Sequence, residues 1–149
     1  MNYQVPISQW VTNGTVSIDK IPDGLASEHA APLQCAGATV YTALSHTVSK
    51  EKRVGIFGIG GLGHLAIQYA AKMGAEVVVF STTAAKEQEA RNWGAHEFYL
   101  VSEMFDKLTT PIDVLVVAGH HYPDWDRFVI NRNNNSVVAT ADTERLGSW

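Results

Sequence analysis

A run of glycines limits the fold of this chain more than any other feature of its sequence. Gly58-Ile59-Gly60-Gly61-Leu62-Gly63 has the spacing G-x-G-x-x-G. The apolar residues 54–57 before it are typical of a short buried strand, and residues 62–73 after it have the pattern of a helix. A strand that turns into a helix through such a run indicates the start of a strand–helix–strand unit.

Strands and helices are expected to alternate along most of the chain. The apolar run Val77–Phe80 is unbroken, which is typical of a strand in a sheet covered on both faces. Ser27 is expected to cap the first helix, and Gly74 to end the helix that follows the glycine run. The other expected strands are 97–101, 113–118 and 136–141, and the other expected helices are 27–44, 85–93 and 103–108. Right-handed crossovers between such strands give a parallel sheet.

The expected fold is therefore α/β, a Rossmann-type doubly wound parallel sheet of about five strands in a single domain. An irregular N-terminal segment, residues 1–26, is expected to precede the domain, residues 27–149. Pro6, Gly14, Pro22 and Gly24 interrupt any regular pattern in that segment.

Composition excludes several classes of function. With 149 residues, 46% hydrophobic and 17% charged, the chain can bury one core. A net charge of −4 with only 11 basic residues argues against binding nucleic acid. No apolar stretch approaches the roughly 20 residues that span a membrane. Cys35 is the sole cysteine and residues 1–10 do not resemble a secretory signal, so a cytoplasmic location is expected.

The glycine run has the chemistry of a diphosphate-binding turn. Gly58 permits the sharp turn, Gly60 lets the backbone approach a diphosphate, and Gly63 lets the helix pack against the strand. The N–H groups around Gly61 and Leu62, at the start of the helix, would then face the anion. The alternative is a glycine-rich turn that only packs tightly.

The end of the second strand bears on which dinucleotide would bind. Sites for NAD usually carry an acidic residue there, which bonds the 2′-hydroxyl of the ribose. This chain has Ser81, Thr82 and Thr83, then Lys86, with no carboxylate between Val77 and Lys86. Hydroxyl groups and an ammonium suit a 2′-phosphate, so we expect NADP(H) rather than NAD(H). The alternative is a helix-capping cluster beside a solvated lysine.

Three segments resemble a known family. They are Ile21–Gly24 (IPDG), Ala31–Tyr41 (APLQCAGATVY) and Val54–Val77 (VGIFGIGGLGHLAIQYAAKMGAEV). Together they are similar to medium-chain zinc-dependent alcohol dehydrogenases, and most to the cinnamyl-alcohol-dehydrogenase-like branch. In that branch an S-[ST]-[ST] run after the second strand accompanies NADP(H). The resemblance is dense from about residue 21 to residue 95 and fades afterwards.

The resemblance also shows which family features have no counterpart here. Members have an N-terminal catalytic domain with a Cys and a Gly-His-Glu segment for catalytic zinc, and a four-cysteine lobe for structural zinc. Cys35 lines up with the remaining catalytic zinc ligand, but His29 and His46 are its nearest candidate partners in sequence. A catalytic zinc needs about three protein ligands, so we expect no metal site and a packed Cys35 thiol.

Two features near the C-terminus suggest further roles. Arg132–Ser136 (RNNNS) replaces a glycine-containing turn usual in the family, and the strand after it is expected at an exposed sheet edge, where a homo-oligomer could form. His120, His121, Tyr122 and Asp124 follow the fourth strand and are candidates for general acid–base catalysis. Alternatively, Asp124 caps a helix and the histidines are solvated. His64 is expected on a helix surface.

Three functions remain open from the sequence. The first is an NADP(H)-binding, alcohol-dehydrogenase-like oxidoreductase domain without the zinc catalytic domain, acting on a small-molecule substrate. The second is a small enzyme that catalyses a non-redox step, such as isomerisation, cyclisation or elimination, in the former cofactor crevice. The third is a non-catalytic remnant that binds a nucleotide or a protein partner. Without zinc, the residues that could polarise a carbonyl are Tyr41, Tyr122, His120 and His121.

Overall fold

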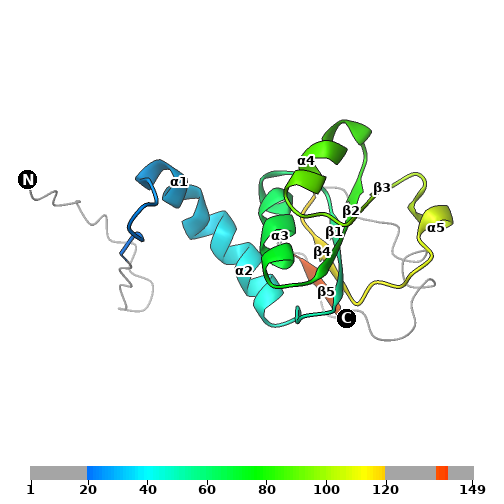
Figure 1. Cartoon of the computed structure of the whole chain (residues 1–149), viewed down its shortest axis with the longest axis horizontal. Coiled ribbons are helices and arrows are strands. Elements are labelled where there is room, and N and C mark those ends of the chain that lie inside the picture. Colours follow the sequence, from blue (N-terminus) through cyan, green and yellow to red (C-terminus); the bar gives the residue numbers. More distant parts are fainter. Residues whose placement is uncertain (1–19, 120–136, 141–149) are drawn as a thin grey trace, which may run out of the picture.

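One parallel sheet forms the body of the molecule. The structure is a computed structural model, and it describes residues 20–119 and 137–140. Its strands are β1 (Arg53–Phe57), β2 (Glu76–Ser81), β3 (Glu97–Leu100), β4 (Val114–Val117) and β5 (Val137–Thr140). They lie in the order β3-β2-β1-β4-β5, and every neighbouring pair is parallel (Figure 1). The expected α/β fold, with its five parallel strands, is confirmed.

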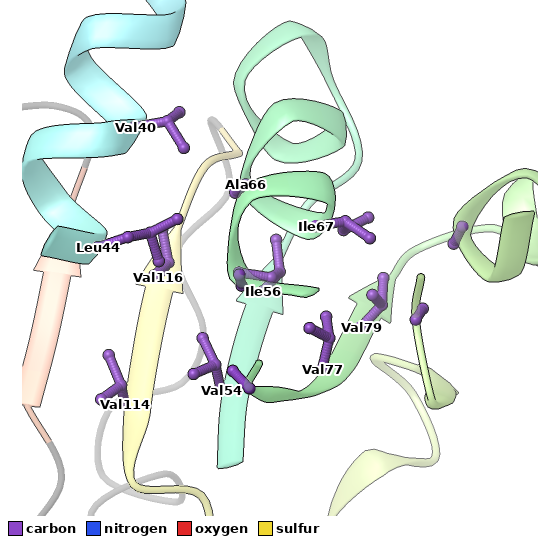
Figure 2. Close-up of a cluster of buried hydrophobic side chains, with 14 of the residues drawn as sticks. Val40, Leu44, Val54, Ile56, Ala66, Ile67, Val77, Val79, Val114 and Val116 are labelled. Carbon is purple, nitrogen blue, oxygen red and sulfur yellow. The ribbon is translucent and has the colours of Figure 1, made fainter. Parts of the chain in front are cut away.

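The two faces of the sheet bury different apolar clusters. Alternate residues of each strand point to opposite faces, and β1 places Val54 and Ile56 on the face that α2 and α3 cover. Figure 2 shows Val40 and Leu44 of α2 and Ile67 of α3 above these strands. On the opposite face, the cluster consists of Phe57, Val78, Phe80, Met104, Ile112, Leu115 and Val117. Burial on both faces explains why the strands are unbroken apolar runs in the sequence.

Helices connect the strands at nearly the expected positions. They are α3 (Gly61–Lys72), the 3₁₀ turn η2 (Ala84–Lys86), α4 (Glu87–Asn92) and α5 (Met104–Lys107). Gly74 follows α3 with a φ of 87°, so the expected left-handed cap after this helix is confirmed. None of the helices among the described residues is long and apolar enough to cross a membrane.

The first expected helix is continuous but not uniformly α-helical. It consists of α1 (Ser27–Pro32), the π-helical segment η1 (Leu33–Gly37) and α2 (Ala38–Ser45). Proline has no N–H and its ring displaces the carbonyl four residues earlier, so Pro32 interrupts the α-helical ladder where η1 begins. The expected Ser27 cap is wrong, because Ala26 occupies the capping position and no side chain bonds there.

This long helix extends from the body as an arm. Figure 1 shows α2 beside α3, whereas α1 lies away from the sheet. Within α1 only Ala30 is buried. Residues 20–26 before it contain no helix or strand, as expected, and the rest of the predicted irregular segment, residues 1–19, lies outside the described residues.

An ion cluster around the buried Arg53 joins three strands at their amino ends. Arg53 of β1 donates to Glu76 Oε1 of β2 at 2.9 Å and to Glu97 Oε2 of β3 at 2.6 Å. The Arg53 side chain is only 8% exposed, so both carboxylates compensate a desolvated guanidinium. Tyr99 donates its hydroxyl hydrogen to Glu97 Oε2 at 2.6 Å, which extends the cluster along β3.

Candidate functional site

The glycine run forms a turn that is locked to two neighbouring strands. Gly58 directly follows β1, and its N–H donates to the carbonyl of Phe80 at 2.9 Å. Its φ is 94°, a left-handed conformation that side chains rarely allow. A Cβ on Gly58 would also lie 2.8 Å from the Cα of Gly119. Gly58 is therefore required by both the conformation and the packing of the turn.

Gly63 and Gly60 differ in what surrounds them. A Cβ on Gly63 would lie 1.9 Å from the carbonyl oxygen of Gly58, so only glycine lets α3 pack this closely against the turn. A Cβ on Gly60 would meet no atom within 4 Å. The backbone of Gly60 has a φ of −106° and a ψ of −157°, which is extended and open to any residue. Neither conformation nor packing within the described residues explains the glycine at position 60.

Helix α3 starts at this turn without a side-chain cap. Gly60 holds the capping position, and within residues 20–119 no side-chain hydrogen bond caps the helix. The first amides of a helix have no acceptor within the helix, so those of Gly61 and Leu62 can bind an external anion. His64 contacts the turn through Nδ1, which lies 3.2 Å from the carbonyl oxygen of Gly60. Its ring also packs 5.6 Å from that of Trp93, in agreement with a place on the helix surface.

The hydroxyl groups after β2 have different surroundings. Ser81 is 5% exposed, and its Oγ donates to the carbonyl of Thr83 at 3.0 Å. Its hydroxyl hydrogen is thus already engaged in shaping the turn. Thr83 Oγ1 accepts from the Ala85 N–H at 3.3 Å and keeps its own hydrogen for another acceptor. Thr82 and Thr83 are exposed. The two threonines are consequently better placed than Ser81 to donate to a phosphate.

Lys86 connects the two halves of the site. It is the last residue of η2, and its Nζ donates to the carbonyl oxygen of Ile59 at 2.8 Å. Ile59 lies between Gly58 and Gly60, in the middle of the glycine turn. The ammonium group has three hydrogens, so two remain for a ligand. The sequence placed Lys86 near the ribose end of the site but gave no indication of this bond.

These residues surround a pocket of about 250 Å³ at the carboxyl ends of the strands. Predicted residues in its lining are Gly58, Gly60, Ser81, Thr82, Thr83 and Lys86. Gly61, Leu62 and Gly63 continue into α3 and do not line it. Sequence reasoning missed Phe57, Ile59, Phe80, Val101, Ala118 and Gly119. Several of these lie at or directly beside the carboxyl ends of strands, a position that indicates a ligand crevice in an open α/β sheet.

The charge of this pocket is positive. Among the described residues that line it, Lys86 is the only charged one. The next carboxylate in the sequence, Glu87, accepts from Arg91 Nη2 at 3.0 Å, so its charge is balanced locally. An anionic ligand would therefore meet hydroxyl groups, backbone amides and one cation in this pocket.

The candidate catalytic residues are not among these groups. His120, His121, Tyr122 and Asp124 lie outside the described residues. Gly119, which directly precedes His120, lines the pocket. Tyr41, another candidate for carbonyl polarisation, lies on α2 with 57% of its surface exposed and is not part of the pocket lining.

The described residues do not assemble a zinc site. Within residues 20–119 and 137–140, no three His, Cys, Asp or Glu side chains lie close enough together to hold a metal ion. Cys35 is exposed, so the expectation of a packed thiol is wrong. It belongs to η1, whose only buried residue is Gly37, and the thiol lies on the uncovered part of the arm.

Comparisons with known proteins show which proteins the chain is similar to. The sequence model of the family described as zinc-binding dehydrogenase matches residues 61–121. Cinnamyl alcohol dehydrogenase 5 of Arabidopsis thaliana is 43% identical over 111 residues, which are 68% of this chain and 30% of that protein. NADP-dependent alcohol dehydrogenase C 1 of Mycolicibacterium smegmatis is 39% identical over 112 residues, 70% of this chain and 32% of the relative.

A solved structure with the same fold supports this relationship. The crystal structure of CAD from Helicobacter pylori, complexed with NADP(H), superposes with a TM-score of 0.66 and 34% sequence identity. The alignment covers 74% of this chain and 31% of that one. The chain thus spans about 30% of the length of the relatives that it matches. Its glycine turn, its sheet order and these matches together place the chain in the medium-chain zinc-dependent alcohol dehydrogenase family, as a Rossmann-type part similar to the cinnamyl-alcohol-dehydrogenase branch.

Proposed function

We propose that the chain is the NADP(H)-binding domain of an alcohol-dehydrogenase-like oxidoreductase. The observation that carries the proposal is Gly60, a glycine that neither the conformation nor the packing of the described residues requires. A ligand that approaches the backbone supplies the missing reason. In the proposed complex the diphosphate lies against Gly58–Gly63, next to the amides at the start of α3.

The preference for NADP(H) over NAD(H) is supported by the other wall of the pocket. Thr82, Thr83 and Lys86 present donors where a carboxylate would favour an unmodified ribose. A 2′-phosphate would gain charge-assisted hydrogen bonds from them. Two of the relatives are described as NADP-dependent or as complexed with NADP(H). When bound, the cofactor would supply a hydride; the residues of this chain would bind it and orient it.

A titration with NADPH and NADH tests the proposal. Energy transfer from tryptophan, including Trp93, whose ring packs against His64 of α3, to the reduced nicotinamide reports binding. We expect NADPH to bind at least about tenfold more tightly than NADH, because one charge-assisted hydrogen bond is worth roughly 1.5–3 kcal/mol. The absence of binding at millimolar NADPH would refute the proposal.

Catalysis is proposed to involve residues 120–124, which follow Gly119 in the sequence. His120, His121, Tyr122 and Asp124 follow Gly119, which lines the pocket, and their imidazole, phenol and carboxylate groups suit general acid–base chemistry. Small alcohols and aldehydes are the proposed substrates, by likeness to the relatives. The double variant His120→Ala and His121→Ala should bind NADPH normally and lose turnover in an aldehyde panel. Unchanged turnover would exclude the two histidines.

Three further points of the proposal concern zinc, assembly and location. We propose that this chain alone holds no catalytic zinc, since Cys35 belongs to no group of three candidate ligands among the described residues. Self-association is proposed through β5, the last of the described strands in the sheet order. A cytoplasmic location is proposed because the only cysteine in the sequence, Cys35, is an exposed free thiol, which suits a reducing compartment.

A further inference from the structure

The side chain of Lys86 does not only face the pocket. It also forms a hydrogen bond to Ile59, another residue of the pocket lining. Lys86 Nζ lies 2.8 Å from the carbonyl oxygen of Ile59, 27 residues away in the sequence. One partner lies on the wall that follows β2, and the other lies in the glycine turn after β1. If the only role of Lys86 were to bind a phosphate, the hydrogen bond to the carbonyl oxygen of Ile59 would have no function.

The bond acts on the peptide group that precedes Gly60. Because a peptide unit is planar and trans, the carbonyl of Ile59 and the N–H of Gly60 point in opposite directions. An ammonium that holds the carbonyl therefore also fixes the direction of the Gly60 amide. A Cβ at Gly60 or Gly61 would meet no atom within 4 Å, so these two residues are not held by contacts in the direction of a side chain. The neighbouring restraints are the N–H of Gly58, which bonds to Phe80, the buried side chain of Ile59, and His64, whose N–H and Nδ1 both contact the carbonyl oxygen of Gly60.

We infer that Lys86 is a positioning residue of the glycine turn, one that couples the proposed 2′-phosphate site to the proposed diphosphate site. With one hydrogen on Ile59 and two left over, it holds the turn in place before the cofactor arrives and can contact the 2′-phosphate without releasing the turn. Cofactors that lack the 2′-phosphate would then also depend on Lys86. The ligand part of this inference rests on the proposed function, whereas the positioning of the turn in the free protein does not.

Amide hydrogen exchange of the ligand-free chain tests the positioning directly. Lys86→Met should accelerate exchange and shift the resonances at Gly60 and Gly61, while Lys86→Arg, which keeps a donor of similar reach, should restore both. Lys72→Met is the matched control, because Lys72 is an exposed lysine in the last turn of α3, far along the helix from the turn. Wild-type exchange and chemical shifts at these amides in Lys86→Met would overturn the inference.

Binding of two cofactors tests the coupling. If Lys86 only contacted the 2′-phosphate, Lys86→Met would weaken NADPH and leave NADH unchanged. We expect NADH to weaken as well, by about 2- to 10-fold, the effect of losing one ordinary hydrogen bond. An unchanged NADH affinity in Lys86→Met would refute the coupling. A wild-type chain that binds neither cofactor would refute the proposed function, and the exchange experiment would still decide whether Lys86 positions the turn.

Discussion

At the scale of single residues, Gly60 and Gly63 differ in whether the surrounding protein leaves room for a side chain. Gly63 is fixed by the protein itself, since a Cβ there would lie 1.9 Å from a backbone oxygen. Gly60 faces open space. The first constraint belongs to folding, and we propose that the second belongs to cofactor binding, so substitutions at the two positions should separate stability from cofactor affinity.

Replacing Gly60 with valine should remove cofactor binding and keep the fold. The extended backbone at Gly60 suits a β-branched residue, and the new side chain would occupy the space through which a diphosphate approaches. We expect the Kd for NADPH to rise at least about tenfold, or roughly 1.4 kcal/mol, with a thermal midpoint near that of the wild type. Gly63→Ala is the contrasting variant and should lower the midpoint sharply. An unaffected Kd in Gly60→Val would contradict the reading of Gly60.

Ionisation of Tyr99 is expected to lower the free energy of unfolding at alkaline pH. Its hydrogen bond to Glu97 raises the pKa of the phenol above the ordinary 10.0; burial and the charge of Glu97 act in the same direction, and Arg53 opposes them. Since the folded-state pKa is raised, the stabilisation is complete below about pH 10 and is lost as the pH rises through the folded-state pKa.

Urea unfolding at a series of pH values up to about 11 checks this dependence, with Tyr99→Phe for comparison. Phenylalanine keeps the ring stacked on Phe80 and removes the titrating group. The stability of the variant should therefore fall less steeply above pH 10 than that of the wild type. Parallel curves would show that Tyr99 is not the responsible group.

At the scale of elements, α2 has two faces with opposite surroundings. Leu44 is fully buried against the sheet beside Val116 (Figure 2), whereas Tyr41 of the same helix is 57% exposed. The hydrophobic effect therefore holds α2 to the body through one face only. Helix α1 continues the arm and buries only Ala30, so it contributes little to that attachment.

Alanine substitutions on the two faces of α2 should differ in their effect on stability. Leu44→Ala leaves a cavity in the core and is expected to cost about 2–5 kcal/mol of unfolding free energy. Tyr41→Ala serves as the control on the same helix and should change it by less than about 0.5 kcal/mol. Denaturant titrations measure both. A large loss in Tyr41→Ala would mean that another surface covers this face of α2 in solution.

For the whole molecule, the order of the strands decides where other chains can add. Among the strands that the structure describes, β5 pairs with β4 and comes last in the sheet order. The unpaired side of an edge strand offers N–H and C=O groups to a second copy. The proposed homo-oligomer is an association of this kind.

Proline substitutions in β5 test that association. Successive N–H groups of a strand point to opposite sides, so Val138→Pro and Ala139→Pro each remove an N–H from a different side. We expect one variant to lose the oligomer while keeping its unfolding midpoint, and the other to lose stability. Sedimentation velocity over a range of concentrations checks this, and a monomer at every concentration would rule out the proposed association.

The local sequence determined most of the architecture. Apolar runs of strand length, a helical pattern between them and Gly58 at the turn were enough to predict the parallel sheet and the site at its carboxyl edge, because each signal lies within a few residues. Errors arose where a signal was weak or distant. Ser27 was one residue off as a cap, and Cys35 was expected to be packed although the arm that carries it has little to pack against.

Only the tertiary structure showed which groups restrain one another across the site. The approach of Gly63 to Gly58 and the bond from Lys86 to Ile59 depend on how β1, β2 and α3 pack. Ser81 looked equivalent to Thr82 and Thr83 in the sequence, but packing buries it and directs its hydroxyl to the backbone of Thr83. Residue type and spacing specify which chemistry is present. The direction in which a polar group points, and whether it is available to a ligand, follow from contacts between segments far apart in the chain.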